Sequence, residues 1–517
     1  MEHKLLTKHA GKTALGTMFS RILGYVRDML VANFFGAGIF ADAFYAAFRI
    51  PNLFRRMLGE GAFSAAFIPV FSYYLHTYSK DETQKLINAV FTALLIVLTI
   101  ITILGIFFSP ILVKLIVWGF ADEPDKLQLT VELARLMFPF ILFICLAAFL
   151  LAALNTLYSF FWSALAPSAL SFAEIIYMLA VIPIISGEQN AIKGLAIAVI
   201  VGGAIHFFIQ YPVLKKLGWG LKFSLNLKHP GIKKIALLMI PSIIGLSVDQ
   251  INAFVDNICA SFLQEGAISA LYYSNRIMQL PLAIFGLALS TVALPAMSRA
   301  AALKDIVGLK NSLNFSIRLS LFALLPAGLG LMLIGYPIVQ VLFERGSFDS
   351  YASLTTNNAL FYYALGLPSF SITKLFANAF YSFQDTKTPV RTAAASMILH
   401  VILCIVLMYP MNVGGLALAT SIAGYFNLAL LVILLRKKIG ALGIKKIVLS
   451  TTKAATAAAA ACFGTLFIYS SLNFNVYAAV FVSIVSACII FAVISKFLKS
   501  EELDICMSIF TKRRING

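Results

Sequence analysis

The chain has 517 residues, of which 60% are hydrophobic and only 12% are charged. Soluble domains carry about 25% charged residues, so this composition excludes a soluble globular protein and indicates a polytopic membrane protein. The 40 basic and 22 acidic side chains give a net charge of +18. Because the basic residues gather in short loops between apolar runs, we interpret this charge as the signal that orients membrane helices, and we expect no nucleic-acid partner.

Fourteen stretches of the chain are long and apolar enough to cross a bilayer, which takes about 20 residues of helix. In chain order they cover residues 13–35, 39–58, 86–110, 131–155, 163–186, 191–213, 235–263, 267–293, 313–338, 355–382, 390–409, 413–435, 450–470 and 476–497. We therefore predict an all-α polytopic membrane protein with about 14 transmembrane helices.

Basic residues mark one side of the predicted membrane. They lie before the first span, after the sixth, after the twelfth and after the last: Lys4, Lys8 and Lys12; Lys215, Lys216, Lys222, Lys228, Lys233 and Lys234; Arg436, Lys437, Lys438, Lys445, Lys446 and Lys453; Lys496, Lys499, Lys512, Arg513 and Arg514. The opposite loops hold few basic residues. Because short cytoplasmic loops are rich in Lys and Arg, we predict that both termini are cytoplasmic.

The chain also repeats itself. Residues 43–53 ("AFYAAFRIPNL") align with 270–280 ("ALYYSNRIMQL"), and residues 62–69 ("AFSAAFIP") align with 288–295 ("ALSTVALP"). Further on, "NTLYSF" at 155–160 matches "NAFYSF" at 378–383. The three matches have nearly the same offset, about 225 residues, which corresponds to six predicted helices. Repeats of this kind are typical of transporters.

Two six-helix halves run through the membrane in the same direction, because six is an even number. Parallel repeats of transporters place the substrate path between the halves. We predict an N-terminal lobe at residues 1–230 with spans 1–6, a C-terminal lobe at 231–440 with spans 7–12, and two extra helices with a basic cytoplasmic tail at 441–517. The two lobes are expected to surround a central cavity.

The first span keeps Arg21, Arg27 and Asp28 at membrane depth, where each charge costs about 2.5–3.5 kcal/mol on an isolated helix. At 1.5 Å per residue, Arg27 lies ~21 Å along a span that crosses a core of ~30 Å. Its side chain therefore cannot readily reach either interface, whereas Arg21 can approach one. We expect Arg27 to face a water-filled cleft and Asp28 to hold an arginine in place.

The second span places Asp42, Arg49 and Arg56 on one face, because they recur every seven residues, and Glu60 lies one further turn along it. For Asp42 and Arg49 we favour a position in the cavity. Arg55 and Arg56 fit equally well as charges at the cytoplasmic end of the span.

The seventh span carries a polar stripe of Asp249, Asn252 and Asp256, at positions i, i+3 and i+7. The stripe must face protein or water, and two interpretations stay open: it coordinates a coupling cation, or it pairs with arginines of the first half. The eighth span adds Asn275 and Arg276.

Arginines from both halves, Arg21, Arg27, Arg49 and Arg276, are thus able to face one cleft. Their planar guanidinium groups suit carboxylate or phosphate and stay charged when dehydrated. With few acids to neutralise them, they indicate a bulky anionic substrate such as a phosphate or diphosphate.

The chain has no HExxH, GxSxG or Walker-type motif, and its six cysteines show no CxxC spacing, so we predict a transporter without catalytic residues, metal or cofactor.

Four stretches carry a family likeness: "MFSRILGYVRD", "GAGIFADAFYAAFRIPNLFRRMLGEGAFSAAFIPVF", "YYSNRIMQLP" and "FYSFQDTKTPV". They resemble the bacterial lipid II flippases of the MurJ (MviN) family, within the multidrug/oligosaccharidyl-lipid/polysaccharide exporter superfamily. The likeness extends over nearly the whole chain. It implies a multi-pass protein of the bacterial inner membrane that moves lipid II, the undecaprenyl-diphosphate-linked disaccharide peptide, from the inner to the outer leaflet by alternating access.

The resemblance also implies roles for individual residues. Cavity arginines that bind the diphosphate fall on Arg21, Arg27, Arg55 and Arg276, functionally important acids fall on Asp42 and Glu60, and Arg49 is a basic position. Asn275 departs from relatives that have an acid there. The last two helices are expected to form a groove for the lipid tail, and the protein is expected to act as a monomer among membrane lipids.

Two alternatives stay within transport: a flippase for another polyprenyl-diphosphate sugar, and a drug exporter of the same superfamily. A membrane scaffold or a membrane-embedded glycosyltransferase is disfavoured. An enzyme of that kind needs a metal-binding acidic motif or a sizeable domain outside the membrane, and the sequence has neither.

Overall fold

A computed structural model describes the backbone of residues 2–471 and 475–512, and their side chains except those of residues 2–15, 57–60, 241–242, 244–249, 470–471 and 509–512. Every regular element in this part of the chain is a helix. The chain forms two compact units, residues 1–269 with 345–348, and residues 270–344 with 349–517.

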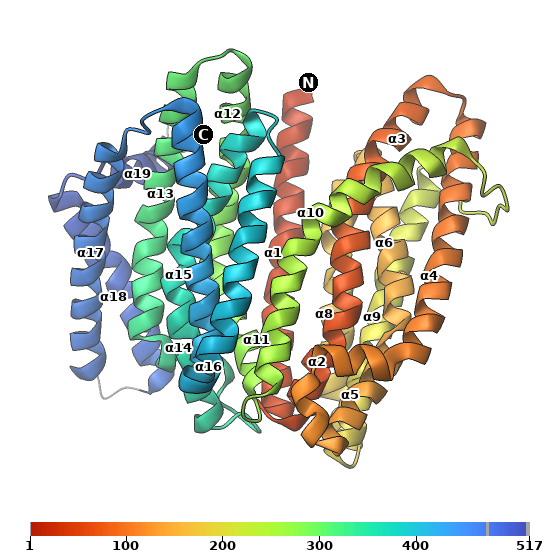
Figure 1. The fold of residues 1–517 in the computed structure, drawn as a ribbon, viewed down its shortest axis with the longest axis horizontal. Coiled ribbons are helices and arrows are strands. Elements are labelled where there is room, and N and C mark those ends of the chain that lie inside the picture. The colour runs from red at the N-terminus through yellow and green to blue at the C-terminus, as the bar shows by residue number, and fades with distance from the viewer. Residues whose placement is uncertain (1, 472–474, 513–517) are drawn as a thin grey trace. The chain divides into compact units, whose positions relative to one another are not determined.

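The first unit contains helices α1 to α10, joined by short 3₁₀ and π segments (Figure 1). In chain order they are α1 (Glu2–Phe35), α2 (Ile39–Phe54), η1 (Arg55–Ala62), α3 (Phe63–Thr77), α4 (Lys80–Ile116), η2 (Trp118–Asp122), α5 (Pro124–Met137), α6 (Pro139–Thr156), α7 (Phe160–Leu165), α8 (Ser168–Ile176), η3 (Tyr177–Val181), η4 (Ile182–Ile184), α9 (Glu188–Lys216) and α10 (Pro230–Ser261).

Aromatic side chains form a core of this unit. Phe63, Phe67 and Phe71 of α3 stack one turn apart, with neighbouring ring centroids 5.2 Å from each other. Phe149 of α6 meets Phe67 edge-on, and Trp219 meets Phe71 in the same way. Edge and stacked ring pairs are the favoured aromatic geometries, so this cluster fixes α3 against α6.

The second unit begins within α11 and contains the remaining helices: α11 (Ala267–Pro281), η5 (Leu282–Leu287), α12 (Ala288–Ala302), α13 (Ile306–Leu333), α14 (Gly335–Phe343), α15 (Ser350–Ser382), α16 (Lys387–Ile439), α17 (Ile444–Ser471), α18 (Val476–Phe497) and α19 (Glu501–Lys512). An aliphatic core including Leu309, Leu375 and Leu435 joins α13, α15 and α16. Helices α17 and α18 pack against each other, and α17 packs on α13 (Figure 1).

The helix bounds repeat along the chain at the offset expected from the sequence. Helices α3 and α12 are both 15 residues long and begin at residues 63 and 288. Helices α2 and α11 end at residues 54 and 281, and a π-helix follows each of them directly. Helices α1 and α10 end at residues 35 and 261. A wide π turn at the same place in both halves indicates that the two repeats share their local geometry as well as their helix order.

Eight helices among the described residues are long and apolar enough to cross a membrane. Helix α1, which contains the first predicted span at 13–35, is not among them, because Arg21, Arg27 and Asp28 lie within that span. The 53-residue α16 is not one continuous helix: its second segment folds back along the first, and Ser396 Oγ donates a hydrogen bond to the Ala423 carbonyl. Asn412 breaks it with a non-helical backbone (φ 49°, ψ −137°) into segments that match predicted spans eleven and twelve. The total of 14 spans stays a prediction.

Helix α10 follows the predicted lobe boundary at residue 230, yet it belongs to the first compact unit through residue 261. It packs against α3, α4 and η1. The two lobes predicted at 1–230 and 231–440 describe a repeat of sequence, and 441–517 follows it as an extra segment, whereas the compact units describe packing. The lobe boundaries therefore stay a prediction.

The "FYSFQDTKTPV" stretch forms the corner between α15 and α16. Gln384 has a positive φ of 60°, and Asp385 accepts hydrogen bonds from the Thr388 backbone N–H (3.1 Å) and from Lys438 Nζ (3.1 Å). Partial burial opposes ionisation of Asp385, but these hydrogen bonds outweigh it and lower the pKa of the carboxyl group. The motif thus has a structural role: it ends α15 and begins α16.

We expect Gly105→Ala in α4 to destabilise the protein. A Cβ at this position lies 2.2 Å from the ring of buried Phe138, and overpacking of this kind costs about 1–3 kcal/mol. Thermal unfolding in detergent measures the loss. Gly330→Ala in α13 is the matched control, because nothing lies within 4 Å of its Cβ position. An equal melting temperature for the two variants would contradict close packing of α4 on Phe138.

Candidate functional site

Arg27 of α1 is held between two buried carboxylates. Its Nη2 and Nε donate hydrogen bonds to Asp28 Oδ1 at 2.6 and 3.0 Å, and its Nε lies 3.2 Å from Glu174 Oε2 of α8. The side chains of Asp28 and Glu174 are 0% and 3% exposed, whereas that of Arg27 is 12% exposed. The Arg27 guanidinium is therefore paired with acids, and part of its side chain remains exposed.

Glu174 is a member of this cluster that the sequence analysis missed. It is the single acid in an apolar run, "SALSFAEIIYMLAV", which occupies the fifth predicted span. An isolated carboxylate at membrane depth needs a cationic or protonated partner. That rule could have identified Glu174, although the sequence does not show that Arg27 is its partner.

The remaining basic residues of the first unit lie in different surroundings. Arg21 is exposed on α1. Arg49 is half-buried and donates from Nη2 to the Ala253 carbonyl of α10 at 2.8 Å. Arg55 begins the π-helix η1, and its Nε donates to Asn52 Oδ1 at 2.9 Å. Arg49 thus connects two helices, while Arg55 is oriented by its own segment.

The other predicted positions are only partly described. Asn252 and Asp256 are half-buried on α10, and the Asn252 Oδ1 atom has no hydrogen-bond partner among the described residues. The side chains of Asp249 and Glu60 lie outside the described residues. Arg276 is half-buried on α11 in the second unit.

Asp42 is the centre of a buried polar joint. Its carboxylate is 1% exposed and accepts hydrogen bonds from the backbone N–H groups of Gly266 (2.8 Å) and Ser269 (2.9 Å). Lys126 of α5, 3% exposed, donates to it at 3.2 Å. The sequence predicts Asp42 in a substrate cavity; in the structure its described contacts are all with protein groups.

The same joint caps two helices reciprocally. Asp42 lies in the first turn of α2 and caps the N-terminus of α11 through Ser269, while Glu265 Oε1 accepts a hydrogen bond from the Ile39 N–H at the start of α2 (2.9 Å). Carboxylates satisfy the unpaired N–H groups of a helix start and interact favourably with its dipole. The joint therefore stabilises the starts of both helices.

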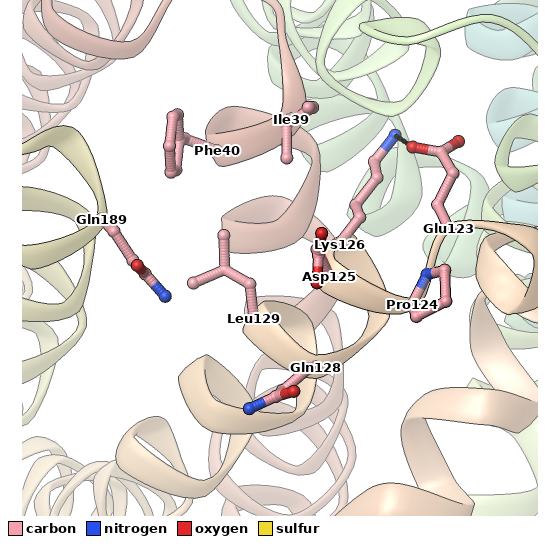
Figure 2. A pocket seen from close by; sticks show the side chains of 9 residues that line it. All are labelled: Ile39, Phe40, Glu123, Pro124, Asp125, Lys126, Gln128, Leu129 and Gln189. Carbon is pink, nitrogen blue, oxygen red and sulfur yellow. Dashed lines mark ion pairs between the residues drawn. The ribbon is translucent and has the colours of Figure 1, made fainter.

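A polar cavity of about 610 Å³ opens beside this joint (Figure 2). It is lined by Ile39, Phe40, Glu123, Pro124, Asp125, Lys126, Gln128, Leu129 and Gln189. The Nζ atom of Lys126 lies 3.9 Å from Glu123 Oε2 and 4.2 Å from the centre of the Phe120 ring. Two acids, Glu123 and Asp125, line the cavity beside Lys126, and Asp42 already engages this lysine.

Comparison with known proteins identifies the family. A family model described as "Lipid II flippase MurJ" matches residues 31–496. The chain belongs to the MurJ family. It is 40% identical over 422 residues to the probable lipid II flippase MurJ of Vibrio cholerae, covering 80% of each chain. It is 35% identical over 426 residues to the lipid II flippase MurJ of Burkholderia cenocepacia, covering 82% of each.

Solved structures agree with this assignment. A lipid II flippase MurJ in an inward closed conformation matches with a TM-score of 0.80 and 28% identity, over 94% of this chain and 98% of that one. An inward-facing multidrug resistance MATE transporter matches with a TM-score of 0.68 over 82% and 95% of the two chains. At 13% identity, the second likeness shows the fold alone.

Membership of the MurJ family confirms three predictions from the sequence. The chain is an all-helical polytopic membrane protein, it is a transporter rather than an enzyme, and its resemblance to the lipid II flippases is real.

We expect Asp42→Asn to destabilise the protein by about 3 kcal/mol, because it leaves the buried Lys126 ammonium with only the half-exposed Glu123 carboxylate, 3.9 Å away, as a counter-charge. Lys126→Met in the same background should recover part of the loss. Denaturation in mixed micelles measures both effects. The control is Glu132→Gln, whose pair with Lys193 is about one-third exposed and so contributes at most about 1 kcal/mol. If Asp42→Asn lowers the free energy of unfolding no more than Glu132→Gln does, the joint does not stabilise the fold.

Proposed function

We propose that the chain moves lipid II from the inner to the outer leaflet of the bacterial inner membrane. Family membership supports this function, since the relatives that match at 33–40% identity are named as lipid II flippases. The observation that carries the proposal is Arg27, an arginine kept ionised at membrane depth by two buried acids and still partly exposed. Such a group is suited to a diphosphate.

In this proposal the head group is bound by arginines of both halves. Arg21, Arg27, Arg49 and Arg55 contribute from the first half and Arg276 from the second. Guanidinium groups bind phosphate oxygens through two parallel hydrogen bonds and remain charged when water is removed. The acids Asp42 and Glu60 contribute differently: Asp42 acts through the joint that it forms with Lys126 and Ser269, whereas Glu60 is proposed from the family resemblance alone.

Transport proceeds by alternating access. The two six-helix halves bind the head group between them and rock to open on the other side of the membrane. The equal placement of π-helices η1 and η5 after α2 and α11 supports this step, because wide π turns loosen a helix and are frequent at functional sites. The Asp249, Asn252 and Asp256 stripe on α10 is the proposed place for a coupling cation.

The lipid tail remains in an apolar environment along α17 and α18. Both helices are rich in Ala and Ser, and they present exposed aromatic side chains, among them Phe463, Phe467 and Phe481. Burial of a long polyprenyl chain is favourable by about 0.8 kcal/mol per CH₂, so the tail stays out of the polar path. The protein acts as a monomer among membrane lipids, with both termini in the cytoplasm.

The alternatives are less well supported. The MATE drug exporters share the fold at 13–16% identity, and no further feature of this chain favours a cationic drug over an anionic lipid. A flippase for another polyprenyl-diphosphate sugar uses the same diphosphate chemistry. Binding of lipid II that is no tighter than binding of other anionic lipids would favour that alternative.

We expect Arg27→Ala to abolish export of the cell-wall precursor while the protein still accumulates in the membrane. Complementation of a strain depleted of its own lipid II flippase measures export, and the leaflet in which lipid II accumulates shows the step that fails. Arg391→Ala, at an exposed position outside the proposed site, is the matched control and should complement fully. Full complementation by Arg27→Ala, or accumulation in the outer leaflet after depletion, would overturn the proposed function.

A further inference from the structure

Glu502, in the first turn of α19, is the centre of a polar cluster in the second unit, which we call the Glu502 node. Its Oε1 atom accepts hydrogen bonds from Arg318 Nε of α13 (2.6 Å) and from Ser450 Oγ near the start of α17 (2.8 Å). Its Oε2 atom accepts one from Ser500 Oγ (2.7 Å), in the short turn that follows α18. One side chain therefore ties the start of α17 and the end of α18 to α13.

The charges of this node are buried and paired. The Glu502 side chain is 4% exposed and that of Arg318 is 15% exposed. Burial opposes ionisation of Glu502, but the hydrogen bonds that it accepts outweigh this effect and lower the pKa of the carboxyl group. Glu501 also contacts Arg318, yet its side chain is 75% exposed, and exposed ion pairs contribute little to stability. Glu502 is therefore the acid on which the node depends.

Apolar side chains pack beside the node. Leu503 of α19 is buried in one cluster with Phe322 of α13 and Ala454 of α17. The ring of Phe322 also meets that of Phe491 of α18, with the ring centroids 4.9 Å apart. Helix α19 lies against α13 and α18 (Figure 1), so polar and apolar contacts hold the same corner of the second unit.

The helix pair α17–α18 needs such a polar contact because its surroundings are apolar. Helices in lipid gain no hydrophobic energy by packing on one another, so close packing of small residues and hydrogen bonds hold them together. Gly464 of α17 shows the close packing, since a Cβ there would lie 2.7 Å from Ile490 Cδ1 of α18. The contact with Arg318 adds direction, because a guanidinium group donates along fixed lines. The node thus holds the helix pair in one position relative to α13.

We propose that Glu502 is a positioning residue that fixes the α17–α18 helix pair against α13 while the lipid tail of the substrate lies along these helices. This role rests on the proposed function, which places the tail there. A helix pair that shifts on α13 changes the apolar surface that meets the tail, and binding of the tail then weakens relative to the surrounding bilayer. Glu502 acts through the node and does not touch the substrate.

The test compares two forms of fluorescent lipid II in proteoliposomes, one with the undecaprenyl tail and one with the much shorter farnesyl tail. Glu502→Gln in the full-length protein removes the charge that Arg318 contacts. This variant should flip the undecaprenyl form about tenfold more slowly than the unmodified protein, a change equivalent to the loss of one charge-assisted contact. Flipping of the farnesyl form should change by less than about twofold, because a short tail meets little of α17 and α18.

Glu501→Gln is the matched control. It removes the neighbouring carboxylate, which also contacts Arg318 but is exposed, and it should change flipping of either form by less than about twofold. A purely structural role for Glu502 would slow both forms equally, because the head-group site would be lost with the fold. Equal slowing of the two forms by Glu502→Gln, or slowing of neither, would overturn the inference.

Ser450→Ala decides the matter if Glu502→Gln does not fold. It removes one hydrogen bond to Glu502 and keeps the ion pair with Arg318, so the undecaprenyl form should be flipped about threefold more slowly and the farnesyl form at an unchanged rate. A loss that is equal for the two forms, or absent from both, would overturn the inference.

The same assay separates this inference from the proposed function. If the unmodified protein fails to flip undecaprenyl lipid II at all, the proposed function fails. If it flips this lipid but Glu502→Gln behaves like Glu501→Gln, only the role of Glu502 fails.

Discussion

The need to pair every charge that leaves water governs this structure. Arg27 is held by Asp28 and Glu174, and Asp42 is held by Lys126 and two backbone N–H groups. An unpaired ion in a membrane interior is costly, whereas a paired and hydrogen-bonded one is tolerated. Two of these pairs, Arg27–Glu174 and Asp42–Lys126, join segments that are distant in the sequence, so the same contacts that make the charges acceptable also position α1 against α8 and α2 against α5.

The two clusters differ in whether one of their charged groups remains accessible to solvent. Around Asp42 the described donors satisfy the carboxylate, and the group is closed to solvent. Around Arg27 the guanidinium keeps a partly exposed edge, and one of its acids belongs to another helix. A satisfied cluster stabilises the fold, whereas a partly exposed one can also meet a ligand. This difference is the reason for proposing that Arg27 contacts the substrate.

The repeat connects local geometry to mechanism. Helices α2 and α11 both end in a proline-containing turn that passes into a π-helix, and α3 and α12 then begin 225 residues apart, at residues 63 and 288. Proline removes a backbone hydrogen bond and loosens the helix that contains it. Both halves thus have a deformable segment at the same place, which is what a rocking motion between two halves requires.

The class, the repeat and the family can be predicted from the amino-acid sequence alone. Apolar length, loop charge and the 225-residue offset are local or periodic properties, and they predicted a helical membrane transporter with Arg27 at depth. The sequence also indicated Asp28 as a partner for an arginine, because the two residues are adjacent.

Which charges meet depends on how the helices pack in three dimensions. Glu174 is 147 residues from Arg27, and Ser269 is 227 residues from Asp42. Helix periodicity shows the face on which a residue lies but not the helix that packs against that face. The contacts of Asp42 with Lys126 and Ser269 were therefore not predicted, and Glu174 was overlooked. Pairing of buried charges depends on contacts across helices, and those are fixed by packing.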